Sequence, residues 1–284
     1  MHKMLFSLLA YTRIPGNAFS FWMRQTLRWS RGTPSPAHES KVDLFAYARE
    51  KRRQAEARAA ELHARYQLEP LAQCSTAALY RKNLHVLDAL EQATQGLWPL
   101  TLPHGEIKAL DVGAQDWYYV FALERWLRCS GRSQRQVRLT GIELDGYERF
   151  SDFHTRQDYA LAYARQTGNP DVKYQVCDFL QFQGQDYDVV FLLHPLLIRY
   201  QLLLWGLPLR CFAPQQLVDR AVAALRPGGW LVIFCHTLRE HNVALELGRG
   251  HGGAQLLREG PILASLVDFQ GEQNDSRFSV WSKL

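Results

Sequence analysis

From residue 107 onward, short and continuously apolar runs alternate with longer stretches of helical character. The runs have the length of strands and occupy residues 107–112, 137–143, 172–177, 187–193 and 230–235. The intervening stretches predict helices over residues 117–129, 153–166 and 215–225. Strands that are apolar along their whole length are buried on both faces, as in a parallel sheet covered by helices. The alternation therefore predicts an α/β fold with a doubly wound, mostly parallel sheet.

The last part of the chain departs from this alternation. ILASLVDF (residues 262–269) and RFSVWSK (residues 277–283) have the composition of strands, and the polar turn GEQNDS separates them. This turn is too short to contain a helix, so we expect the two strands to form a C-terminal antiparallel hairpin. The preceding GRGHGG (residues 248–253) lacks the lysine of a phosphate-binding loop and predicts a flexible loop, with a substrate-side lid as its functional interpretation.

The first 72 residues predict a helical extension ahead of a domain that spans residues 73–284. The stretch PGN predicts a turn in which Asn17 caps a helix that runs to Arg31. Residues 32–36 read as a linker. A second helix is expected from about Ser40 to Tyr66, with its many opposite charges on a solvated face.

The extension also carries the basic charge of the chain. Residues 1–72 contain 12 Lys and Arg but only 6 Asp and Glu, whereas the remainder is nearly neutral. In the first expected helix the arginines fall on one side, and the opposite side holds Phe19, Trp22, Met23, Thr26 and Trp29. We expect this apolar side to pack against the main domain. Peripheral contact of residues 1–31 with an anionic membrane is the alternative. The absence of a base-stacking motif argues against nucleic acid as a partner.

The cysteines and the apolar runs restrict the class of protein further. The five cysteines are scattered and form no CxxC pair, which argues against a zinc site and a disulfide framework. We therefore expect no metal and a reducing, cytoplasmic location. No apolar run reaches the roughly 18–20 residues of a membrane span. The start MHKMLFSLLAY has a short apolar stretch but no small-residue cleavage site, so we do not expect a cleaved signal peptide.

Five motifs follow one another in the second part of the chain. They are KALDVG (108–113), TGIELD (140–145), YQVCDFLQF (174–182), YDVVFLLHP (187–195) and LRPGGWLVI (225–233). In this order they resemble the motifs of class I S-adenosylmethionine-dependent methyltransferases, over about residues 105–284. The resemblance implies a Rossmann-like methyltransferase fold and S-adenosylmethionine as cofactor. The first motif is a variant, because Gln115 and Trp117 stand where further glycines would be expected.

The resemblance implies a cofactor site beyond the carboxyl ends of the strands. Asp111 and Gly113 end the first strand, and glycine lets the backbone approach a ligand. Ala114 is small enough to leave this approach open, and Gln115 can donate or accept a hydrogen bond. The aromatic residues 117–119 are expected to wall the pocket.

Two further strand ends supply acidic residues. Glu143, followed by Leu144, can accept hydrogen bonds from the ribose hydroxyls, with Asp145 as the alternative. Asp178 resembles the acid of the family that bonds the adenine amino group, and Phe179 could pack on the ring. An ordinary helix or turn cap is the alternative role for Asp178.

His194 follows the fourth strand, where the family places residues that face the substrate. Its imidazole could act as a general base toward a hydroxyl or an amine, or have a structural role only. His236 and Arg239 are weaker candidates. Members that methylate nucleic-acid bases or glutamine carry an Asn/Asp-Pro-Pro-Tyr-like sequence here, whereas this chain has HPLL. The prediction is therefore O- or N-methylation of a small molecule or natural product, with the N-terminal helices covering the site as a lid. A catalytically inactive, cofactor-binding protein that acts through its basic N-terminus is the alternative. A nicotinamide oxidoreductase is disfavoured, because its glycine fingerprint is absent.

Overall fold

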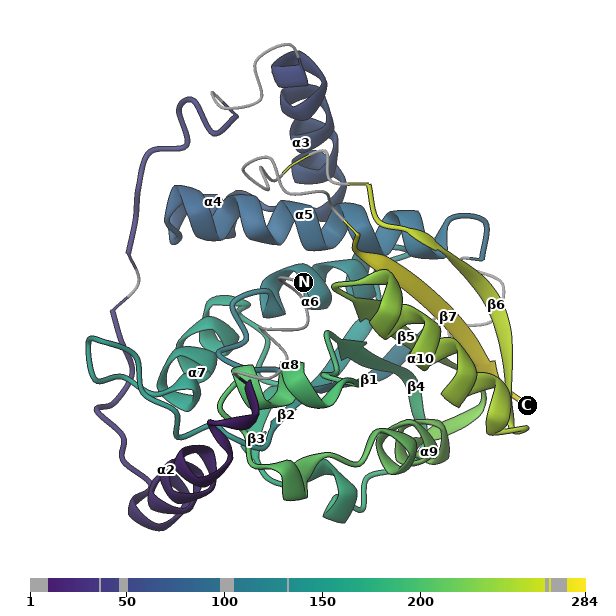
Figure 1. The fold of residues 1–284 in the computed structure, drawn as a ribbon. Coiled ribbons are helices and arrows are strands. Elements are labelled where there is room, and N and C mark those ends of the chain that lie inside the picture. Colours follow the sequence, from purple (N-terminus) through teal and green to yellow (C-terminus); the bar gives the residue numbers. More distant parts are fainter. Residues whose placement is uncertain are drawn as a thin grey trace.

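The computed structural model describes residues 10–35, 37–45, 51–97, 105–131, 133–263, 266 and 275–284. They form one seven-stranded sheet with helices on both faces (Figure 1). The strands are β1 (Glu106–Val112), β2 (Gln136–Glu143), β3 (Val172–Val176), β4 (Tyr187–Leu193), β5 (Leu225–Cys235), β6 (Ala254–Pro261) and β7 (Arg277–Lys283). The helices are α2 (Ile14–Leu27), α3 (Arg52–Tyr66), α4 (Glu69–Gln73), α5 (Ala77–Thr94), α6 (Val120–Cys129), α7 (Arg156–Gln166), α8 (Arg199–Leu204), α9 (Pro214–Ala224) and α10 (Leu238–Gly250). Two short 3-10 helices are η2 (Phe179–Gln181) and η3 (Leu209–Cys211).

The strand order is β3-β2-β1-β4-β5-β7-β6. Strands β1 to β5 pair in parallel, and β7 runs antiparallel between β5 and β6. Helices α5, α6 and α7 cover one face of the sheet, and α9 and α10 cover the other (Figure 1). The predicted doubly wound, mostly parallel sheet with an antiparallel C-terminal pair is confirmed. The strand order reverses between β1 and β4, which is where such sheets bind ligands.

The predicted partner of the last strand is wrong. β6 is Ala254–Pro261 rather than residues 262–269, and it pairs with β7 from Ala254 opposite Lys283 to Pro261 opposite Arg277. Much of the predicted strand and turn, residues 264, 265 and 267–274, lies outside the described residues.

GRGHGG is not a lid. It spans the end of α10 and the turn into β6, at the edge of the sheet opposite the carboxyl ends of the parallel strands. Gly248 serves packing, because a Cβ there would lie 2.6 Å from the ring of Trp281.

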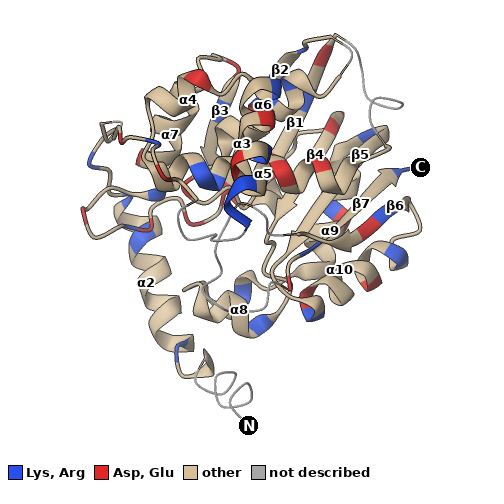
Figure 2. Ribbon diagram, turned by 90° about the horizontal axis from the view of Figure 1, so that it is seen from above, with Lys and Arg blue, Asp and Glu red and all other residues tan. Residues whose placement is uncertain are grey.

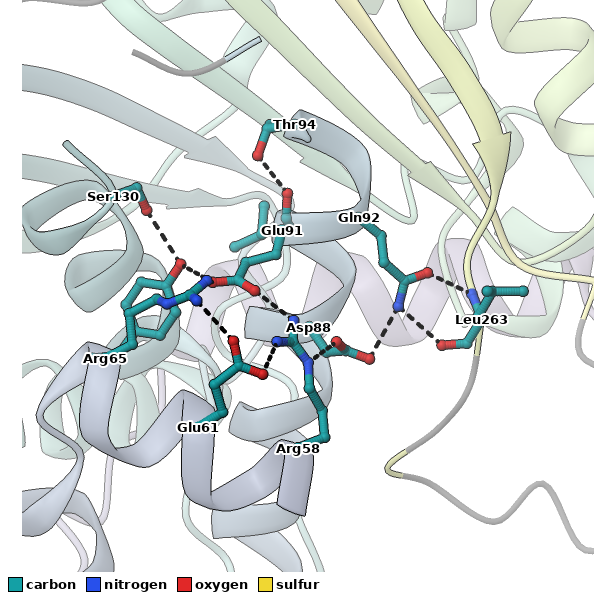
Figure 3. Close-up of polar contacts among 11 residues, drawn as sticks. Arg58, Glu61, Arg65, Asp88, Glu91, Gln92, Thr94, Ser130 and Leu263 are labelled. Atoms are coloured by element: carbon teal, nitrogen blue, oxygen red, sulfur yellow. Dashed lines mark hydrogen bonds and ion pairs between the residues drawn. The ribbon is translucent and has the colours of Figure 1, made fainter. Parts of the chain in front are cut away.

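In the second part of the extension, α3 packs against α5 and is joined to it by ion pairs. The helix expected from Ser40 begins only at Arg52; residues 42–45 form a turn and residues 46–50 lie outside the described part. Arg58 of α3 bonds the Asp88 carboxylate over 2.8 Å and also binds Glu91 of α5 (Figure 3). The charged face of α3 is therefore partly paired with a neighbouring helix rather than only solvated.

Helix α2 differs from its prediction in both bounds and orientation. It begins at Ile14, with Pro15 in its first turn, and ends at Leu27 rather than at Arg31. Asn17 is therefore no cap; its Nδ2 donates to the carbonyl oxygens of Leu203 (2.8 Å) and Leu207 (3.1 Å).

The expected packing of the apolar side of α2 against the main domain is wrong. Phe19 and Trp22 are 63% and 53% exposed, whereas Arg24 faces the protein and pairs with Asp145. The ion pair and the amide bonds of Asn17, rather than apolar burial, fix which face turns inward.

Candidate cofactor site

A cavity of about 360 Å³ lies at the carboxyl ends of the parallel strands. A volume of this size is at the lower end of the range typical of small-molecule sites. Its floor consists of residues that end or follow β1 to β4: Val112, Gly113, Gln115, Ile142, Glu143, Leu144, Cys177, Asp178, Phe179, Leu180, His194, Pro195 and Leu196. The cavity therefore occupies the edge at which the strand order reverses.

The loop after β1 keeps a left-handed backbone at alternate positions. The φ angles are +79° at Gly113, +56° at Gln115 and +56° at Trp117. These are the first glycine of the motif and the two positions where further glycines would be expected. A left-handed conformation costs roughly 1–2 kcal/mol at a residue with a Cβ. The chain thus retains the loop geometry with two larger residues, and the contacts of the loop must offset the strain.

Those contacts come from β2. The backbone nitrogens of Gly113 and Ala114 both donate to the carbonyl oxygen of Ile142, over 2.8 and 3.0 Å. The nitrogen of Gln115 donates to Oε2 of Glu143 over 2.8 Å. A Cβ added at Gly113 would meet no atom within 4 Å, so open space lies beside this backbone. A ligand can therefore approach the loop closely at Gly113.

Trp117 anchors the loop from behind and does not wall the pocket. It is fully buried, and its Nε1 donates to Oδ2 of Asp111 over 2.8 Å. Its ring lies against Gly141, where a Cβ would come within 2.7 Å of it. Tyr118 and Tyr119 do not line the cavity either.

Asp111 and Ala114 lie behind the cavity wall. Neither lines the cavity, and both are fully buried. Burial raises the pKa of Asp111 to about 7. The structure therefore gives Asp111 a role in holding Trp117 and offers no surface of these two residues to a cofactor.

Glu143 is held in place by two backbone donors and lines the cavity. Its Oε2 accepts from Gln115, and its Oε1 accepts from the nitrogen of Asp145 over 2.8 Å. The residue is only 5% exposed. A carboxylate has about four lone-pair sites, so two hydroxyl donors can still bind an anchored Glu143.

Asp145, the alternative ribose acceptor, has a different role. Its side chain is fully buried outside the cavity lining, and Arg24 binds both of its oxygens, over 3.0 and 2.8 Å. Arg24 also pairs with Glu148 over 2.9 Å. The structure therefore assigns Asp145 to the attachment of α2 and gives no support to the ribose role.

Asp178 and Phe179 follow β3 and both line the cavity. Oδ1 of Asp178 accepts from the nitrogen of Leu180 over 2.9 Å and caps η2, so the cap interpretation is confirmed. Phe179 is only 5% exposed. The cap fixes one carboxylate oxygen of Asp178 at the rim of the cavity.

His194 lies at the cavity directly after β4, with a left-handed backbone (φ +65°). Its imidazole stacks on that of His236, with ring centroids 3.5 Å apart and an interplanar angle of 7°. Burial, followed by the neighbouring His236 and His85, lowers the pKa of His194 well below its usual value. The ring is therefore neutral near pH 7 and can accept a hydrogen bond. His236 touches the site only through this ring, and Arg239 does not line the cavity.

The sequence did not identify the residues of the cavity roof, although the N-terminal helices were expected to cover the site. It consists of Phe21 from α2 together with Leu202, Trp205, Leu207, Arg210 and Phe212 from α8, η3 and their flanks. Phe21, Leu202 and Leu207 form a small apolar cluster of their own. The apolar run LLLWGL in the sequence was the available signal, but no element had been assigned to it. Part of the extension, α2, therefore covers the site.

Two other features concern metals and membranes. Within the described ranges, no three His, Cys, Asp or Glu side chains gather as a metal site would require. No helix in that part of the chain is both long and apolar enough to cross a bilayer.

Comparisons with known proteins give structural but no sequence matches. No family of protein sequences matches the chain, and neither does any curated protein. A Listeria monocytogenes protein classified as a class I S-adenosylmethionine-dependent methyltransferase has a similar structure (TM-score 0.50, 14% identity). The match covers 72% of this chain and 59% of that protein, so the chain spans less than two thirds of its length.

Two complexes are more distant. The N-methyltransferase NodS of Bradyrhizobium japonicum WM9, solved with S-adenosyl-L-homocysteine, has a TM-score of 0.45 at 15% identity, over 72% of this chain and 87% of that one. The magnesium protoporphyrin IX methyltransferase of Synechocystis PCC 6803, solved with bound cofactor, has a TM-score of 0.46 at 13% identity, over 73% and 81%. Strand order, terminal antiparallel pair and structural match agree: the chain has the Rossmann-like fold of class I S-adenosylmethionine-dependent methyltransferases.

Proposed function

We propose that the protein binds S-adenosylmethionine in the cavity at the strand ends and transfers its methyl group to a small molecule or natural product, at oxygen or nitrogen. The observation that carries this proposal is the placement of Glu143. Its carboxylate lines the cavity at the end of β2, and two backbone donors hold it there without using all of its lone pairs. The ribose hydroxyls are suitable donors for such a carboxylate.

The other residues of the floor match the rest of the cofactor. The open space beside Gly113 admits the methionine portion close to the backbone. Asp178, with one oxygen fixed by its cap, lies where it can accept from the adenine amino group, and Phe179 lies beside it. The side chains at this edge thus offer an acceptor for each donor group of the adenosine.

The bound cofactor would supply a sulfonium-activated methyl group, which needs little further activation. The protein then contributes mainly by holding the acceptor in line with that methyl group and by excluding water under the roof of α2 and α8. His194, neutral because burial lowers its pKa, can accept a proton from a hydroxyl or an amine. A base with a lowered pKa is weak, so positioning supplies most of the acceleration.

The low basicity of His194 also favours a second candidate, a cofactor-binding protein without methyltransferase activity. Incubation with S-adenosylmethionine labelled at the methyl group and a small-molecule extract separates the two. Transfer of label to a compound supports the enzyme. Retained cofactor binding without transfer supports the second candidate.

Calorimetric titration with S-adenosylmethionine and S-adenosylhomocysteine tests the cofactor proposal. We expect the wild type to bind both, and Glu143→Ala to weaken binding about tenfold or more, since two hydroxyls lose their acceptor. Glu246→Ala, at an exposed position of α10, is the matched control and should leave the affinity unchanged. No binding by folded wild type would refute the proposal. Unchanged affinity in Glu143→Ala would remove the ribose role from this residue.

A further inference from the structure

Helix α2 turns a polar side toward the protein and an apolar side toward solvent. On the outer side Phe19, Trp22 and Leu27 are 63%, 53% and 68% exposed. On the inner side Asn17 and Arg24 bond to the protein body, and Phe21 is the only inward aromatic residue of this helix. Amphipathic helices of globular proteins normally bury the apolar side, so the orientation of α2 is inverted.

Specific polar contacts fix this orientation. Arg24 neutralises the fully buried carboxylate of Asp145, and Nε2 of Gln25 donates to the carbonyl oxygen of Leu144 over 3.0 Å. If the helix rotated to bury its aromatic residues, Asp145 would lose its closest charge partner in a buried place, which is costly. The aromatic side is therefore held outward by the folded protein.

The exposed apolar surface extends beyond α2. Nε1 of Trp29 donates to the carbonyl oxygen of Phe153 over 3.1 Å, and Arg13 reaches the carbonyl oxygen of Leu204 over 3.4 Å. These two contacts attach the flanks of the helix to the protein body, and Trp29 itself is 50% exposed. We call the exposed apolar side chains of α2 and its C-terminal flank the α2 outer surface: Phe19, Trp22, Leu27 and Trp29.

The charged side chains of α2 and its flanks are all positive. Residues 10–35 contain four arginines and no aspartate or glutamate. In Figure 2 the coloured charged positions on α2 and at its ends are basic, and none is acidic. Arg13, Arg28 and Arg31 are exposed. Of the nearby acids, Glu148 pairs with Arg24, and the carboxylate of Asp152 is bonded by Tyr159 and His154.

We propose that the α2 outer surface docks on an anionic lipid bilayer, with α2 in the plane of the interface. Exposed Trp, Phe and Leu side chains on one side of a helix, flanked by arginines and without acids, match the boundary between headgroups and acyl chains. The arginines match the negative potential of anionic lipids. Because Phe21 lines the cavity on the inner side of α2, docking places the roof of the site against the membrane. Residues 1–9, which were also expected at the membrane, lie outside the described residues.

The test is sedimentation of the full chain with phosphatidylcholine vesicles that contain or lack phosphatidylglycerol. We expect binding to the mixed vesicles and little to pure phosphatidylcholine. The double variant Phe19→Ser/Trp22→Ser should bind the mixed vesicles at least about tenfold more weakly than the wild type, because two apolar anchors are lost. Val42→Ser/Leu284→Ser changes two apolar residues outside this surface that are even more exposed, and this variant should bind like the wild type. Thermal unfolding verifies that all variants are folded.

Charge substitution gives an independent readout. Arg13→Gln and Arg28→Gln should each weaken binding to the mixed vesicles by about fivefold, and added salt should reduce the difference. Equal binding to both vesicle types, or no binding at all, would overturn the proposal. So would a wild type that self-associates through Phe19 and Trp22 in gel filtration while ignoring vesicles, which would identify a second copy of the chain as the occupant. None of these outcomes depends on cofactor binding.

Discussion

The floor of the cavity and the α2 helix above it differ in how well the sequence predicts them. Ordered motifs predict the residues of the floor, whereas the helical pattern of α2 does not predict which of its sides faces the protein. Five ordered motifs located Glu143, Asp178 and His194, and the structure brings all three to one cavity. The helical pattern of α2 separated its two sides correctly but assigned the wrong one to the protein. Strand ends of a parallel sheet meet at one edge whatever the side chains are, whereas the orientation of a surface helix depends on its particular partners.

The most severe way to break the floor is Gly113→Val. Gly113 has φ +79°, a conformation that a β-branched residue rarely adopts, and the new side chain would enter the cavity. We expect affinity for S-adenosylhomocysteine to fall by about 100-fold or more, measured by calorimetry. The affinity of Gly113→Ala should lie between those of the wild type and Gly113→Val. Wild-type affinity in a folded Gly113→Val would show that the cofactor does not approach this loop.

The matching way to break the roof is Arg24→Ala. It leaves the buried carboxylate of Asp145 without its bidentate partner and should lower the free energy of unfolding by about 3 kcal/mol. Urea unfolding measures this loss, and chymotrypsin, which cleaves after aromatic residues such as Phe21 and Trp22, should cleave within a detached α2 faster. Arg28→Ala, an exposed control four residues on, should change stability by less than about 0.5 kcal/mol. Equal effects of both substitutions would contradict the assigned orientation.

The limits of prediction from sequence have physical causes. Glu143 and Asp145 are two residues apart and chemically alike, so only the backbone turn after β2 decides which one faces the cavity. The partner that occupies Asp145 lies 121 residues away along the chain. Trp117 was expected to wall the pocket. It is buried instead because Gly141 of β2 leaves room for its ring, and the sequence around Trp117 does not reveal this contact. GRGHGG was expected to be a flexible loop. The sequence alone does not distinguish a glycine that makes room for a ring, as Gly248 does for Trp281, from a glycine in a flexible segment.

Asp111→Asn sharpens the distinction between the cavity floor and the wall behind it. The raised pKa of Asp111, about 7, means that the folded protein binds a proton which the unfolded chain, near 3.8, has already released. This stabilising contribution is fully present below about pH 4 and is lost as the pH rises through 7.

Asparagine does not titrate and can still accept from Trp117. The stability of Asp111→Asn relative to wild type should therefore increase by on the order of 2 kcal/mol between pH 5 and pH 8. Denaturant unfolding at the two pH values measures it. A difference that is independent of pH would contradict the buried, protonated state. Cofactor affinity should stay close to wild type, because Asp111 does not line the cavity.

Gln115→Gly should have the smallest effect. It relieves a left-handed residue (φ +56°) but adds freedom to the unfolded chain, so we expect a change in stability of no more than about 1 kcal/mol. The backbone bond from residue 115 to Glu143 needs no side chain and should persist, so cofactor affinity should change less than twofold. A large loss of affinity would instead assign a direct contact to the Gln115 side chain.

The most direct test of the proposed site is a crystal structure of the protein with S-adenosylhomocysteine. We predict both ribose hydroxyls within hydrogen-bond distance of the Glu143 carboxylate, and the adenine between Asp178 and Phe179 under the α2 roof. A well-defined ligand bound elsewhere, or one whose ribose lies away from Glu143, would contradict the account.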